Sequence, residues 1–136
     1  MKYVLDTNAV SALMRGEQAM IARLLAVEPA EVGVSHPTWA EIHYGIERLP
    51  ASKKKTALRE KLELLRSEIP TVPWSERVSE SFGEIKATLE KQGKRLEDFD
   101  VAIAAHALAS GSVLVSANTQ HMLRVPALLV EDWSKL

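Results

Sequence analysis

The sequence predicts an α/β fold with a mostly parallel central sheet of four to five strands that is flanked by helices. Two observations support this prediction. Short apolar runs of strand length recur along the chain, and segments with helical periodicity separate them. A parallel sheet of this kind is covered by helices on both faces. The chain has 136 residues without a linker or low-complexity stretch, so we expect a single domain over residues 1–136.

The first half of the chain alternates strands with helices. Residues 3–5 are an apolar run typical of a buried strand. Two helices should follow over residues 9–14 and 17–27, before a second strand over residues 31–35. Pro37 then marks a helix start, because its missing N–H is harmless in a first helical turn. This helix should place four residues in the core, namely Trp39, Ile42, Ile46 and Leu49.

The second half continues the alternation. A charged, exposed helix is expected over residues 52–67 and an amphipathic helix over residues 75–92. Between them, two prolines limit residues 70–73 to a brief edge strand. Asp98 or Asp100 should cap a helix of small residues. This helix and the elements after it are expected at residues 101–110 (helix), 113–116 (strand), 118–119 (loop) and 128–130 (strand).

Composition excludes several classes of protein. With 17 Lys and Arg residues against 18 Asp and Glu residues, the chain does not coat nucleic acid by bulk charge, although it can bind nucleic acid locally. The absence of cysteine excludes disulfides, thiolate zinc sites and cysteine nucleophiles, and it suits a reducing compartment. Asp6 interrupts the apolar start, so we expect no secretory signal. The weakly polar run over residues 101–109 is too short to cross a membrane. We therefore expect a cytoplasmic protein.

Acidic residues occur where the predicted strands end. Asp6 follows the first strand, Glu41 lies early in the helix after the second strand, and Asp100 opens a later helix. Asn118 follows another strand. In such sheets, ligands bind beyond the carboxyl ends of the strands, which all four residues can reach. Helix capping is the simpler explanation for each Asp taken alone. It does not explain Glu41, which has no Lys or Arg nearby in residues 28–47.

Three converging carboxylates would repel one another unless a cation lay between them. An all-oxygen set without cysteine suits Mg²⁺, with Mn²⁺ as a substitute. The four histidines lack the spacing of a zinc peptidase, and we expect them to be core or surface residues (His36, His43, His106 and His121). The chain also lacks a glycine-rich phosphate loop, which excludes P-loop hydrolysis of nucleoside triphosphates.

Five segments in this order resemble the PIN domain of the VapC toxin type. They are Leu5–Asn8, Trp39–Gly45, Asp100–Ala107, Val115–Thr119 and Val125–Trp133, and they extend over essentially the whole chain. The resemblance implies a PIN-like three-layer fold and a Mg²⁺-dependent endoribonuclease that is the toxin of a toxin–antitoxin pair. It also implies a homodimer, a VapB-type antitoxin that blocks the site, and larger assemblies with that antitoxin. The RNA substrate would be structured, with tRNA cut in the anticodon loop as the favoured target.

The resemblance also assigns roles to residues. Asp6, Glu41 and Asp100 match the three acids of the family, of which the two aspartates would bind the metal directly. Glu41 would bind it through water or hold the attacking water, and cleavage would leave a 5′-phosphate and a 3′-hydroxyl. Three further residues match supporting polar positions, namely Asn8, Ser116 and Asn118. Many PIN domains have a fourth acid where this chain has Asn118, so a second metal is less expected.

Basic residues are concentrated in two later segments. Residues 53–66 contain six basic and two acidic residues, and we interpret them as a solvated helix face. Residues 86–95 contain four basic residues and one acidic residue, just before the Asp100 loop. The RNA contacts that we predict are Arg48, Lys91, Lys94 and Arg95.

Three other functions compete with the nuclease. A haloacid-dehalogenase-type phosphatase needs an aspartate two residues after Asp6, where this chain has Asn8. A receiver domain needs an acidic pair after the first strand, which is also missing. A catalytically degenerate PIN-like RNA-binding or regulatory module remains the alternative, although the three retained acids argue against it.

Overall fold

The computed structural model describes residues 1–135 and contains a five-stranded parallel sheet with the strand order β3-β2-β1-β4-β5. The strands are β1 (Tyr3–Leu5), β2 (Val32–Ser35), β3 (Thr71–Val72), β4 (Val113–Val115) and β5 (Val130–Glu131). Because all pairs are parallel, the carboxyl ends of the strands share one edge of the sheet. The predicted α/β class and parallel sheet are confirmed.

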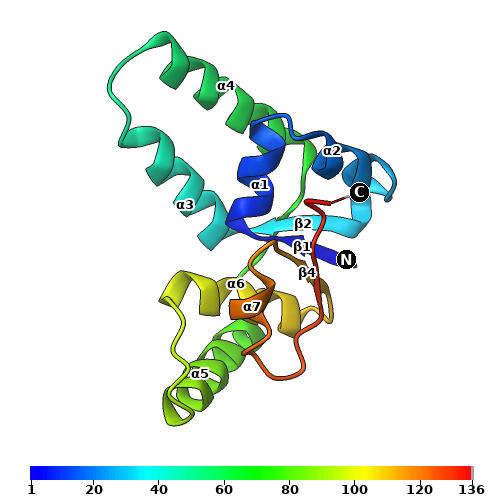
Figure 1. Cartoon of the computed structure of the whole chain (residues 1–136), viewed down its shortest axis with the longest axis vertical. Coiled ribbons are helices and arrows are strands. Elements are labelled where there is room, and N and C mark those ends of the chain that lie inside the picture. Colours follow the sequence, from blue (N-terminus) through cyan, green and yellow to red (C-terminus); the bar gives the residue numbers. More distant parts are fainter. Residues whose placement is uncertain (136) are drawn as a thin grey trace.

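Helices cover both faces of this sheet. They are α1 (Thr7–Met14), α2 (Gln18–Leu25), α3 (His36–Glu47), α4 (Lys53–Glu68), α5 (Glu76–Lys91), α6 (Asp98–Ala109) and α7 (Thr119–Met122), with a 3-10 turn at Pro29–Glu31. Figure 1 shows α1 to α4 on one side of the sheet and α5 to α7 on the other. This arrangement gives the three layers that the sequence predicts. No helix within residues 1–135 is long and apolar enough to cross a lipid bilayer.

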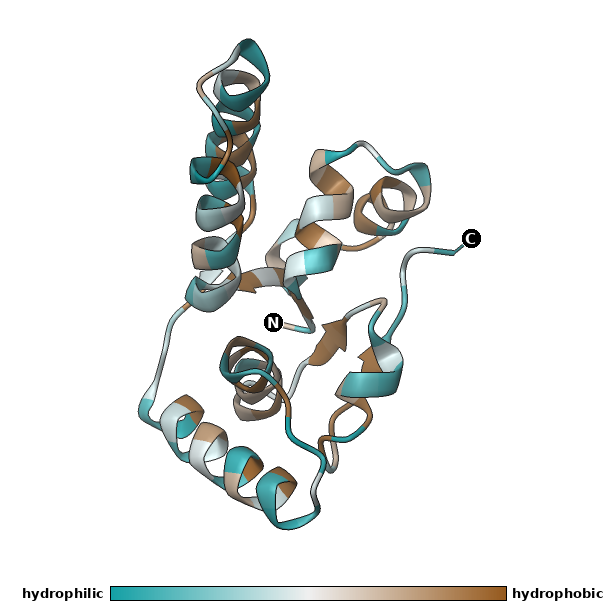
Figure 2. Ribbon diagram, turned by 60° about the vertical axis from the view of Figure 1, so that its left-hand side comes forward, coloured by the Kyte–Doolittle hydropathy of each residue, from teal (hydrophilic) through white to brown (hydrophobic). Residues whose placement is uncertain are grey.

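The central strand β1 joins two hydrophobic cores. Tyr3 and Leu5 face the core under α1 to α4, while Val4 faces the core under α5 and α6. Neighbouring side chains of a strand point to opposite faces, so three residues are enough to serve both cores. Figure 2 shows hydrophobic strands between helices with hydrophilic outer surfaces. The sheet edge that carries the polar residues is therefore built on a rigid, fully buried strand.

Several predicted elements differ in the structure. Helix α6 begins at Asp98 and has Glu97 as its N-cap residue, so neither Asp98 nor Asp100 caps it. The predicted loop at residues 118–119 instead leads into the short helix α7, which Met122 anchors in the core. Helices α1 and α2 and the last strand also begin or end at other residues than expected, and Leu49 lies outside the core.

Local causes explain these shifts. Helix α1 starts at Thr7 because Asp6 caps it, and α2 ends at Leu25, ahead of the turn at Pro29. The last strand starts at Val130 because Ala127, with a φ of 66°, turns the chain there. Leu49 lies beyond the end of α3 at Glu47 and is only half-buried.

Candidate active site

Asp6 lies directly after β1 and is only 4% exposed. Its carboxylate Oδ1 accepts a hydrogen bond from the Ala9 backbone N–H at 2.8 Å, so Asp6 is the N-cap of α1. Burial raises the pKa of Asp6, and the carboxylates of Asp100 and Glu41 raise it further. The hydrogen bonds from Ser116 and Ala9 partly oppose this rise in pKa. Asp6 is thus both a helix cap and a buried member of an acidic group.

Glu41 lies in the second turn of α3 and is half-buried. The Thr7 hydroxyl, in the first turn of α1, donates a hydrogen bond to Glu41 Oε1 at 2.5 Å. This bond joins two helices that follow neighbouring strands of the sheet, and it occupies one carboxylate oxygen. The second oxygen, Oε2, remains for a ligand.

Asp100 lies in the first turn of α6 and is half-buried. Burial is the main cause that raises its pKa, and Glu41 and Glu97 add to the effect. His121 acts in the opposite direction and lowers the pKa of Asp100. The helix N-terminus also carries a partial positive charge that favours a carboxylate at this position.

The three acids predicted from the sequence therefore interact across the carboxyl edge of the sheet. The carboxylates of Glu41 and Asp100 raise the pKa of Asp6, and the carboxylate of Glu41 raises the pKa of Asp100. None of the salt bridges within residues 1–135 involves Asp6, Glu41 or Asp100. Carboxylates that repel one another and lack a basic partner form an oxygen donor set that suits a hard divalent cation.

The donor set is open rather than a closed cage. Within residues 1–135, no group of three or more His, Asp or Glu side chains is arranged so that it could hold a metal ion together. Mg²⁺ usually keeps several waters and binds one or two carboxylates together with substrate phosphates. That mode of binding needs only one or two of the three acids as direct ligands.

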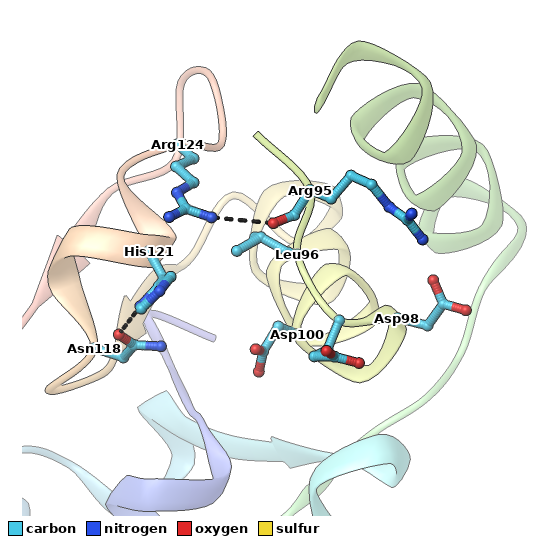
Figure 3. Close-up of a pocket in the computed structure, with 8 residues that line it drawn as sticks. Arg95, Leu96, Asp98, Asp100, Asn118, His121 and Arg124 are labelled. Atoms are coloured by element: carbon cyan, nitrogen blue, oxygen red, sulfur yellow. Dashed lines mark hydrogen bonds between the residues drawn. The ribbon is translucent and has the colours of Figure 1, made fainter. Parts of the chain in front are cut away.

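A cavity of about 630 Å³ opens beside Asp100. Its lining residues come from the loop before α6, from α6 itself and from α7, and Figure 3 shows them. They are Arg95, Leu96, Glu97, Asp98, Asp100, Asn118, His121 and Arg124. Arg95 and Arg124 thus line the same cavity as Asp100. A phosphodiester substrate needs this combination of basic and acidic residues.

Asn118 and His121 lie together in this cavity. His121 Nδ1 and Asn118 Oδ1 form a hydrogen bond of 2.5 Å across the start of α7. The backbone N–H of Asn118 donates to the hydroxyl of Ser116, which is fully buried at the end of β4. Sequence reasoning assigned His121 to the core or surface. The spacing from Asn118 is the only signal that could have found it, and it becomes visible once α7 is known.

Asn8 lies apart from the Asp100 cavity. It is exposed on α1 and lines a separate cavity of about 240 Å³ between α1, α2 and the C-terminal segment. Arg15 and Trp133 line the same space. Asn8 therefore lines a different cavity from Asn118, while Val115 and Ala117, on either side of Ser116, line the same cavity as Asn8.

The predicted RNA contacts are spread over the surface. Arg95 lines the Asp100 cavity, but Figure 3 shows its guanidinium on the side of Asp98 and away from Asp100. Lys94 lines an adjoining cavity. Lys91, at the end of α5, and Arg48, after α3, are exposed but line neither cavity. Arg124, which the sequence analysis did not single out, lines both cavities.

Comparison with known proteins places this geometry in context. The family profile of the PIN domain matches residues 3–128. Ribonuclease VapC2 of Haemophilus influenzae is 35% identical over 133 residues, which is 98% of each chain. The tRNA(fMet)-specific endonuclease VapC of Shigella flexneri is 29% identical and covers 98% of this chain and 99% of its own. The fold also matches a crystal structure of VapBC2 from Rickettsia felis bound to a promoter DNA fragment. That match has a TM-score of 0.88 and 28% identity, over 98% of this chain and 99% of the other.

Proposed function

The chain belongs to the PIN-domain family and to its VapC ribonuclease branch, and we propose that it is a Mg²⁺-dependent endoribonuclease that acts as a toxin. The observation that carries this proposal is the group of three acids at the carboxyl edge of the sheet. They interact with one another and form no salt bridge within residues 1–135. A chain that had lost catalysis would have little reason to keep such an unfavourable arrangement.

The three acids would hold the cation, with Asp6 and Asp100 as its direct ligands. When bound, Mg²⁺ would neutralise charge on the reacting phosphate and lower the pKa of a water molecule. Mn²⁺ would substitute for it. A second ion is not part of the proposal, because Asn118 is neutral and hydrogen bonds with His121.

The protein would contribute fixed oxygen atoms to this chemistry. The Ala9 N–H holds Asp6 Oδ1, and the Thr7 hydroxyl holds Glu41 Oε1. Glu41 therefore keeps Oε1 in place and presents Oε2, while Asp6 is held by both Ala9 and Ser116. Glu41 Oε2 would orient the attacking water in line with the phosphodiester bond and accept its proton. Cleavage would then leave a 5′-phosphate and a 3′-hydroxyl.

We propose tRNA as the substrate, cut in its anticodon loop. Two observations support this choice. A relative that matches 98% of this chain carries the name tRNA(fMet)-specific endonuclease, and a cavity of about 630 Å³ lined by Arg95 and Arg124 lies beside Asp100. Sequence-specific recognition of RNA usually targets unpaired loops, whose bases are accessible. Such a substrate would be met in the cytoplasm.

We also propose a VapB-type antitoxin as the partner that blocks the site. Solved relatives include VapBC complexes, among them the Rickettsia felis complex bound to DNA from its promoter. We further propose that this chain forms a homodimer that assembles with its antitoxin. The open reading frame beside the gene tests this directly, because a short DNA-binding antitoxin should be encoded there.

Two experiments test the nuclease function. Antitoxin-free protein should cleave total tRNA in Mg²⁺, and EDTA should stop the reaction. Induction of the chain alone should arrest bacterial growth, whereas an Asp6→Asn, Asp100→Asn variant that accumulates to the same level should not. RNA binding and growth arrest without cleavage would support the regulatory module instead.

A further inference from the structure

The wall of the cavity opposite Asp100 contains a polar pair that the proposed roles do not use. His121 lies on α7, and its Nδ1 hydrogen bonds with Asn118 Oδ1 at 2.5 Å. Both residues line the cavity that contains Asp100, and Figure 3 shows them across the open space from that carboxylate. A substrate that fills this cavity therefore lies between this pair and Asp100.

The bond to Asn118 determines what His121 can offer. An amide Oδ1 accepts hydrogen bonds and cannot donate them, so the proton of this bond is on His121 Nδ1. In a neutral ring, the other nitrogen, Nε2, is then an acceptor. Within residues 1–135, Nε2 has no hydrogen-bonding partner, and the side chain is exposed. His121 thus presents an acceptor of fixed direction to the cavity.

Asn118 is itself held at the edge of the sheet. Its backbone N–H donates to the hydroxyl of buried Ser116 at 3.0 Å. The hydrogen bond from the same hydroxyl to Asp6 lowers the pKa of that carboxylate. The side chain of Asn118 does not cap α7, which leaves its amide oxygen for His121. The orientation of the His121 imidazole therefore depends on Asn118, whose backbone Ser116 holds at the carboxyl end of β4.

The nearby arginines have a different chemistry. Arg124 Nη1 donates to the backbone carbonyl of Arg95 at 3.0 Å, and Figure 3 shows the Arg95 guanidinium beside Asp98. A guanidinium donates hydrogen bonds and never accepts them, so it suits phosphate oxygens. In its neutral form, His121 adds an acceptor nitrogen to this wall, beside the Asn118 amide oxygen that already accepts from Nδ1.

A neutral acceptor selects one group of the RNA backbone. Phosphate oxygens only accept hydrogen bonds, whereas the ribose 2′-hydroxyl can donate one and is absent from DNA. We propose that His121 Nε2 accepts a hydrogen bond from a ribose 2′-hydroxyl next to the cleaved bond, with Asn118 as its positioning residue. This pair would make the site prefer RNA to DNA. The inference rests on the proposed ribonuclease function.

The test measures binding to the anticodon stem-loop of initiator tRNA, tRNA(fMet), for which the Shigella flexneri relative is named. One version is all ribose, and the other has 2′-deoxynucleotides in the loop only, which preserves the stem. The quantity measured is the Kd for the deoxy version divided by the Kd for the all-ribose version. In the non-cleaving Asp6→Asn background, adding His121→Ala should lower this ratio by roughly three- to ten-fold, the effect of one hydrogen bond. Asn118→Ala should also lower this ratio, since it releases the ring. Gln120→Ala is the matched control on α7 and should leave the ratio unchanged, because Gln120 lines only the adjoining cavity.

Two outcomes overturn the inference. A ratio that His121→Ala does not change would exclude a contact with the 2′-hydroxyl. An equal loss of affinity for both versions would assign His121 to phosphate. Failure of the proposed function is a separate result: a wild-type chain that cleaves no RNA refutes the nuclease, while the binding comparison in Asp6→Asn still decides the role of His121.

Discussion

Replacing Asp6 by asparagine should abolish cleavage and yet stabilise the fold when divalent cations are absent. Asp6 is buried, and the carboxylates of Asp100 and Glu41 add to the rise in its pKa. A raised pKa means that the folded state prefers the protonated group, so the ionised group opposes folding at neutral pH. An asparagine has no charge, and its oxygen can still accept the bond from the Ala9 N–H at 2.8 Å. Asp6→Asn therefore removes the charge and keeps the cap.

Asp6→Ala separates the charge from the cap. Alanine also removes the charge, but it leaves the Ala9 N–H without its buried acceptor. Loss of such a cap lowers the free energy of unfolding by about 1–2 kcal/mol. In a domain of this size, 1 kcal/mol corresponds to a change of about 3–5 °C in Tm. We therefore expect Asp6→Ala to melt about 3–10 °C below Asp6→Asn.

The stabilisation by Asp6→Asn should also depend on pH. The free energy of unfolding of wild type begins to fall below that of Asp6→Asn as pH rises above the pKa of an unfolded aspartate, about 3.9. The difference is complete above the raised pKa of Asp6 in the folded chain. The two proteins should thus be equally stable near pH 4 and differ most at neutral pH. Thermal and urea unfolding in EDTA, followed by circular dichroism, measures this difference. An Asp6→Asn chain that is less stable than wild type at pH 7 would refute the reasoning.

Three further predictions concern the hydrogen bond to Glu41, the metal and the buried histidine. Thr7→Val should lower the cleavage rate by roughly three- to ten-fold and lower Tm by a few degrees at most, because Glu41 Oε1 loses its donor. Thr56→Val, on the exposed face of α4, is the control and should cleave normally. Mg²⁺ at one hundred times its Kd should stabilise wild type by about 2.7 kcal/mol and Asp6→Asn much less, as differential scanning calorimetry would reveal. Burial lowers the pKa of His106, so its contribution to stability is present above pH of about 6.5 and is lost as pH falls through the lowered pKa. His106→Leu should remove this loss from urea unfolding curves recorded between pH 7 and 5, and an unaltered pH profile would contradict the assignment.

The sheet and its acidic edge were predictable from the sequence because both depend on local patterns. Buried strands are short apolar runs, and polar residues directly after such runs lie at the carboxyl edge of the sheet. Asp6 is the clearest case, since Tyr3–Leu5 matches β1 residue for residue. Asp6 also caps α1, as expected, so the same residue is both a helix cap and a member of the acidic group.

The environment of Asp100 was less predictable, because it depends on tertiary contacts. Helix α7 has four residues, too few to show a period, and it forms because Met122 is buried in the core. This helix brings His121 within hydrogen-bonding distance of Asn118. The direction of the Arg95 side chain likewise depends on how its loop runs from α5 to α6, which its position in the sequence does not reveal.

Near-neutral net charge conceals an uneven distribution. Acidic groups meet at the carboxyl edge of the sheet, while basic groups lie around the cavity beside it. An acidic centre binds a cation, and the basic surroundings attract phosphates. The sum of charges alone therefore says little about nucleic-acid binding by this chain.

The most direct measurement is cleavage of initiator tRNA by antitoxin-free wild type and by the Asp6→Asn, Asp100→Asn double variant, at matched concentrations in Mg²⁺. Both proteins should be folded by circular dichroism before the comparison. We predict cleavage by wild type at a defined bond and none above background by the double variant. Equal cleavage by the two proteins would contradict the assignment of the active site to these carboxylates.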